Sequence, residues 1–105
     1  MNGTRALKIM QDVSVKAADT MSVIASYIVR SSDGEYHVVV VDRMEDLQDR
    51  VGFYTVDEIS GTYTLLNFIG IRQDRGTDAS YMSYLGTRGY KVVAGYRPVP
   101  NTDCA

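Results

Sequence analysis

Residues 21–42, MSVIASYIVRSSDGEYHVVVVD, hold two runs rich in Val, Ile and Tyr on either side of an Asp-Gly pair. β-Branched and aromatic residues favour strands, and Asp-Gly between two such runs is a strong signal for a β-hairpin. The predicted arms are residues 22–30 and 35–41, and the turn between them requires a positive φ at Gly34. This stretch therefore places a hairpin at the centre of the fold.

The second arm of this hairpin contains four consecutive valines, Val38–Val41. Because successive side chains of a strand point to opposite faces, such a run makes both faces apolar. A strand of this kind is usually central in its sheet or covered on both faces.

Three more strands are predicted after the hairpin, at residues 53–57, 62–72 and 90–96. A turn at Ser60-Gly61 joins the first two into a second hairpin. Gly70 interrupts the strand at 62–72, which indicates a bulge or a close approach of another group to the backbone.

The first fifth of the chain fits two structures. At three- and four-residue spacing, residues 4–20 form an apolar stripe that predicts a helix, with Thr4 as a possible cap. Leu7, Ile9, Val13 and Val15 also fit one face of a strand. We favour the helix, because Ala and Lys prefer helices.

Two further helices are predicted. Asp42 and Glu45 have the spacing of a capping box, which predicts a helix at about 43–51. Asp78 is a suitable N-cap for a helix at about 79–86, which Gly86 or Gly89 would end.

Together these elements predict an α+β fold with a mainly antiparallel sheet of about five strands and two or three short helices on one face. The length favours a single domain, residues 1–105, with residues 98–105 as a frayed tail. The opposite face of the sheet would then be open and rich in Tyr and Val, so we expect a homodimer or a partner to cover it.

Composition excludes several classes of function. The chain has a net charge of −2, which gives it no general attraction to nucleic acid. Cys104 is the only cysteine, so an internal disulfide is impossible and a cysteine-based metal site is not expected. The chain shows neither a secretory signal nor an apolar run long enough to span a membrane, and we expect a cytoplasmic protein without membrane association.

Groups suited to catalysis are few. His37 is the only histidine, and it is either a general acid–base or a polar residue on a half-exposed strand. We favour the polar strand residue, because no nucleophile motif accompanies it. Asp42, Glu45, Asp46 and Asp49 could hold a hard cation such as Mg²⁺, but they fit the solvated face of a helix better. We therefore predict no catalytic residue, no metal and no cofactor.

Charge is distributed unevenly along the chain. Residues 31–60 hold eight acids and two bases, a balance of −6, and residues 61–105 hold five bases and three acids, a balance of +2. Arg and Tyr together are favoured at protein interfaces. The predicted protein interface comprises Arg72, Arg75, Tyr81, Tyr84, Arg88 and Tyr90 on the basic part, with Glu45, Asp46 and Asp49 on the acidic part.

Three functions agree with these features. The first is a small non-enzymatic interaction protein, an adaptor or inhibitor that binds a larger protein, of the kind that phages and mobile elements carry. The second is a dimeric ligand-binding domain or cofactor-free enzyme, with His37, Tyr27 or Tyr63 in a pocket between sheet and helices. The third is an oligomeric sponge that binds a nucleotide through Arg72, Arg75 and Arg88. We favour the first, because catalytic groups are scarce, and a pocket large enough for a ligand would favour the second.

Overall fold

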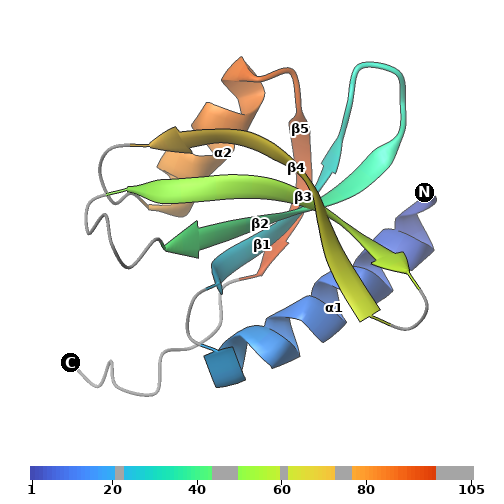
Figure 1. The fold of residues 1–105 in the computed structure, drawn as a ribbon. Helices are drawn as coiled ribbons and strands as arrows, with labels where there is room; N and C mark the ends of the chain where they lie inside the picture. Colours follow the sequence, from blue (N-terminus) through green and yellow to red (C-terminus); the bar gives the residue numbers. More distant parts are fainter. Residues whose placement is uncertain (21–22, 44–49, 60–61, 73–76, 97–105) are drawn as a thin grey trace.

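The computed structural model describes residues 1–20, 23–43, 50–59, 62–72 and 77–96. Five strands form one antiparallel sheet in the order β4-β3-β2-β1-β5 (Figure 1). The elements are α1 (Gly3–Thr20), β1 (Val23–Arg30), β2 (Tyr36–Arg43), β3 (Val51–Ile59), β4 (Thr62–Arg72), α2 (Asp78–Thr87) and β5 (Lys91–Tyr96). The predicted α+β class and mainly antiparallel five-stranded sheet are thus confirmed.

The predicted hairpin is formed by β1 and β2. Gly34 has φ 88°, and its N–H donates to the carbonyl of Ser31 at 2.9 Å, which closes the turn. The Asp33 carboxylate accepts a hydrogen bond from the Ser31 hydroxyl and another from the Glu35 N–H at 3.1 Å. These two bonds, the Ser31 bond first, lower the pKa of Asp33 below its usual value.

The valine run occupies the centre of the sheet. β2 is the third of five strands, and Val38–Val41 are all buried. Val39 and Val41 belong to one core cluster, whereas Val38 and Val40 belong to a second cluster on the other face. The expectation of a strand covered on both faces is confirmed.

The two helices lie on opposite faces of the sheet, so the prediction that the helices share one face is wrong (Figure 1). α1 buries Ala6, Ile9, Met10 and Val13 against Ile28, Val38, Val40 and Val56. α2 buries Tyr81 and Leu85 in the cluster that contains Tyr27, Val39 and Phe53. The apolar second face of β2 explains the arrangement, because each face needs a cover. A fully open face is therefore not a reason to expect a homodimer.

The helix boundaries differ from the predicted ones at their first residues. Residues 3–20 are helical, as favoured, but the side chain of Asn2 rather than Thr4 caps the helix, with its Oδ1 accepting from the N–H of Arg5 at 2.8 Å. Thr77 rather than Asp78 caps α2, since its Oγ1 accepts from the N–H of Ser80 at 3.3 Å. Asp78 is instead the first residue of the helix.

The helix predicted at 43–51 is wrong at both ends, because Arg43 ends β2 and Val51 begins β3. Residues 44–49, which include Glu45, Asp46 and Asp49, lie outside the described residues, as do Arg75 and the predicted tail at 98–105.

Candidate functional site

The edge strand β5 contains a β-bulge at Val93. Val29 of β1 pairs with Val92, and the preceding Ile28 pairs with Ala94, so Val93 is the extra residue. Val92 consequently packs against the core cluster under α2, whereas Ala94, two positions later, packs against the cluster under α1. Bulges are frequent at sheet edges and next to binding sites, where they redirect side chains.

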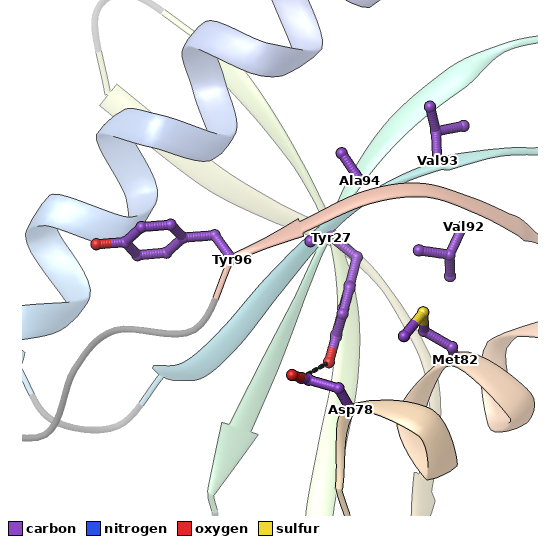
Figure 2. Close-up of a pocket in the computed structure, with 8 residues that line it drawn as sticks. Tyr27, Asp78, Met82, Val92, Val93, Ala94 and Tyr96 are labelled. Atoms are coloured by element: carbon purple, nitrogen blue, oxygen red, sulfur yellow. Dashed lines mark hydrogen bonds between the residues drawn. The ribbon is translucent and has the colours of Figure 1, made fainter.

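A groove of about 430 Å³ runs between β5 and α2 (Figure 2). It is lined by Tyr27, Asp78, Met82, Val92, Val93, Ala94, Gly95 and Tyr96, which we call the β5–α2 groove. Five of these residues are consecutive in β5, although their side chains lie on both sides of the strand. The groove therefore follows the edge of β5 rather than one face of the sheet.

A hydrogen bond between two side chains lies at one end of the groove. The Tyr27 hydroxyl donates to Oδ1 of Asp78 at 2.7 Å, which links β1 to the first turn of α2 (Figure 2). A carboxylate at this position is stabilised by the positive end of the helix dipole. The β5–α2 groove thus combines apolar walls with a single charged residue, Asp78.

Exposed apolar side chains gather at this groove. Six large hydrophobic residues of the described part of the chain are exposed, and three of them, Met82, Val93 and Tyr96, line the β5–α2 groove. The other three are Leu7 on α1 and Leu66 and Phe68 on β4. Exposed apolar groups clustered beside a hollow are typical of binding surfaces.

Two residues of the predicted interface, Tyr84 and Arg88, contact each other on the side of α2 that faces β3 and β4, and a third, Arg72, bonds to the same helix. The Tyr84 ring stacks on Phe53, with centroids 4.5 Å apart, and its hydroxyl accepts from Arg88 Nη2 at 3.0 Å. The Arg88 guanidinium also lies 5.0 Å from the centre of the same ring. Arg72 donates to the carbonyl of Ser80 at 3.1 Å. These side chains join α2 to the edge of the sheet.

The other described residues of the predicted interface lie deeper. Tyr81 has 0% of its surface exposed and is part of the core, so it presents no surface to a partner in this fold. Tyr90 is half-buried and makes an edge-on contact with His37, with 6.3 Å between the ring centres. The β5–α2 groove includes neither His37 nor Tyr90, but it includes Tyr27 from the set of predicted pocket residues.

Gly70 shows the close backbone approach that its position in a strand predicts. A Cβ at Gly70 would collide with the hydroxyl of Tyr84, which sits directly on this part of β4. Extra residues at Leu66 and Ile69 shift the register of β4 against β3, so the strand is also bulged beside Gly70. Both alternatives predicted for this glycine are therefore present.

The described residues contain neither a cluster of metal ligands nor a membrane-spanning helix. No group of three or more His, Cys, Asp or Glu side chains in the described ranges is placed to hold a metal ion. No helix in the part of the chain that the structure describes is long and apolar enough to cross a bilayer.

The β5–α2 groove itself was missed by sequence reasoning, although one residue signalled it. Gly95 lies in the predicted strand at 90–96, and a glycine within a strand often marks a close backbone approach. Here the approaching group is the ring of Tyr27, which a Cβ at position 95 would meet at 2.7 Å. Comparisons of the chain with protein-family models, curated proteins and solved structures found no match.

Proposed function

We propose that this chain is a non-enzymatic binding protein, an adaptor or inhibitor, which holds a larger protein at the β5–α2 groove. The observation that carries the proposal is the concentration of exposed apolar side chains, Met82, Val93 and Tyr96, along one edge of the sheet. Burial of such side chains, with Tyr and Met among them, is the usual source of affinity at protein interfaces.

The alternative surface on α2 is less suited to carry the affinity. The side chains on this surface already make contacts within the fold: Tyr84 stacks on Phe53 and accepts from Arg88, and Arg72 donates to the carbonyl of Ser80. A partner that bound these side chains would have to replace those contacts. Val93, by contrast, is 54% exposed, so a partner would bury its apolar surface. An Arg88→Glu variant tests this second surface in the same experiment.

The chain also offers a matched control for the groove. Phe68 on β4 is 53% exposed, close to the 54% of Val93 on β5, and the two strands are the opposite edges of the sheet. A charged residue at either position adds one negative charge to an exposed apolar site on an edge strand. Only Val93→Asp alters the β5–α2 groove, whereas Phe68→Asp removes a ring contact with Tyr54, 5.1 Å between centres, on the far edge of the sheet.

Affinity capture from the native host with tagged full-length chain tests the proposal. We expect wild type and Phe68→Asp to retain one protein at near-stoichiometric yield by mass spectrometry, and Val93→Asp to lose it. Circular dichroism and thermal unfolding check that each bait is folded. A partner that Val93→Asp retains and Arg88→Glu loses would place the interface on the other side of α2.

A small-ligand carrier is the second candidate, and the volume of the groove supports it. Pockets for small molecules measure about 300–1,000 Å³ and combine apolar walls with a few polar groups. The β5–α2 groove, at about 430 Å³ with the Tyr27–Asp78 pair, lies in that range. Native mass spectrometry of protein purified from its host separates the candidates, because a carrier would retain a ligand mass that Val93→Asp reduces.

A further inference from the structure

We infer that Met82 is a modification site, at which hydrogen peroxide converts the thioether to a sulfoxide and thereby releases the partner held at the β5–α2 groove. This inference rests on the proposed function and adds a form of regulation at the same site.

Met82 differs from the other methionines of the described ranges in its exposure. It is 41% exposed on α2, whereas Met10 on α1 is 5% exposed and belongs to the core under that helix. Met1 is partly buried against the same core. Because oxidation follows exposure, an oxidant in solution modifies Met82 before Met10.

The Met82 side chain forms part of the apolar wall of the groove. It extends from α2 toward β5, where Val92, Val93 and Ala94 line the same hollow (Figure 2). Methionine suits such a wall, because its unbranched and polarisable side chain adapts to the surface that packs against it. Met82 is thus exposed in the free chain and lies where a bound partner would cover it.

The oxidation step transfers one oxygen atom and two electrons. A lone pair of the Met82 sulfur attacks one oxygen of hydrogen peroxide, so that an S–O bond forms and the O–O bond breaks. The departing hydroxide takes up the proton of the transferred oxygen and leaves as water. The sulfur is oxidised by two electrons and the peroxide is reduced by two, and methionine sulfoxide reductase reverses the change.

The product is polar at a place where the groove is apolar. In the free chain, water can donate hydrogen bonds to the sulfoxide oxygen. A partner that packs on the wall removes this water, and a buried acceptor without a donor costs free energy. Because Met82 belongs to neither core cluster, oxidation should leave the fold intact and weaken partner binding about tenfold or more.

Oxidation of the free full-length chain with dilute hydrogen peroxide, followed by peptide mass spectrometry, tests the site. We expect the sulfoxide at Met82 to appear well before the sulfoxide at Met10. An excess of the captured partner should slow the reaction at Met82, because the partner covers this side chain. Equal rates at the two methionines, or no protection by the partner, contradict the inference.

The effect on binding is measured with the captured protein as the probe. Met82→Leu is the matched control, because it keeps an apolar side chain of similar volume and removes only the oxidisable sulfur. We expect peroxide to weaken binding by wild type, methionine sulfoxide reductase to restore it, and Met82→Leu to bind equally before and after treatment. If treated Met82→Leu also loses the partner, another residue is responsible and the inference is overturned. Circular dichroism checks that each treated protein is folded.

The inference and the proposed function fail in different ways. If Val93→Asp loses the captured protein but the chain oxidised at Met82 retains it, the function stands and the inference falls. If no protein is captured, or if the captured protein does not depend on Val93, the proposed function falls. The regulation then falls with it, whatever the rate of oxidation at Met82.

Discussion

Gly95 in β5 lies directly against the ring of Tyr27 in β1, and a Cβ at position 95 would stand 2.7 Å from Cδ1 of that ring. This closeness lets the buried tyrosine reach past β5 and donate to Asp78 on α2. The position of the groove, the link between sheet and helix and the absence of a side chain at residue 95 thus depend on one another.

Gly95→Ala should lower the free energy of unfolding by about 1–3 kcal/mol, the usual cost of adding a methyl group to a filled site. The ring of Tyr27 is buried and has little room to move away. Urea denaturation measures the loss. Gly86→Ala is the matched control, because a Cβ there meets nothing within 4 Å, and we expect it to be neutral or to stabilise by about 0.4–1 kcal/mol. A Gly95→Ala protein as stable as wild type would show that the ring is free to shift.

Gly34→Val should lower the free energy of unfolding by about 1 kcal/mol or more, because Gly34 has φ 88° and a β-branched residue is strained there. Gly34→Asn should cost less, since Asn tolerates the left-handed region. Urea denaturation of both variants checks this order, and equal stabilities would contradict it.

Gly70 and Tyr84 should be coupled in a double-mutant cycle. Gly70→Ala alone should destabilise, because its methyl group would meet the Tyr84 hydroxyl, which also accepts from Arg88. In the background of Tyr84→Ala the same change should cost less, with a coupling free energy of about 0.5–3 kcal/mol. Additive effects in thermal unfolding would mean that the two residues do not touch.

The hairpin turn should make a contribution to stability that depends on pH. Hydrogen bonds from Ser31 and from the Glu35 backbone lower the pKa of Asp33 in the folded state below its unfolded value. The stability that this carboxylate contributes is therefore present above the unfolded pKa, about 3.8, and is lost as pH falls through the lower folded pKa. The difference in unfolding free energy between wild type and Asp33→Asn should shrink as the pH falls over that range. At neutral pH the same difference should be smaller when it is measured in a Ser31→Ala background.

His37→Ala should leave partner binding and biological activity within a few-fold of wild type. His37 contacts Tyr90 and does not line the β5–α2 groove. Removal of a general acid or base typically lowers a rate by about 10²–10⁴. A loss of that size in a variant with an unchanged circular dichroism spectrum would support the cofactor-free enzyme instead.

Local patterns predicted most of the elements, whereas the site depends on pairings that no local pattern contains. The Asp33-Gly34 turn and the Val38–Val41 run predicted the central hairpin and a strand covered on both faces. The placement of β5 beside β1 joins residues far apart in the chain, and the bulge at Val93 reverses the faces that simple alternation would assign. The groove arises from these two long-range features, so only Gly95 gave a local sign of it.

Hydrogen–deuterium exchange of the chain with and without its captured partner tests the location of the interface most directly. We expect slower exchange at the amides of β5 and at the first turn of α2, with β4 unchanged, because a bound partner covers the edge of β5 and the side chains of Met82 and Val93. Protection confined to β4, or to the side of α2 that carries Tyr84 and Arg88, would contradict it.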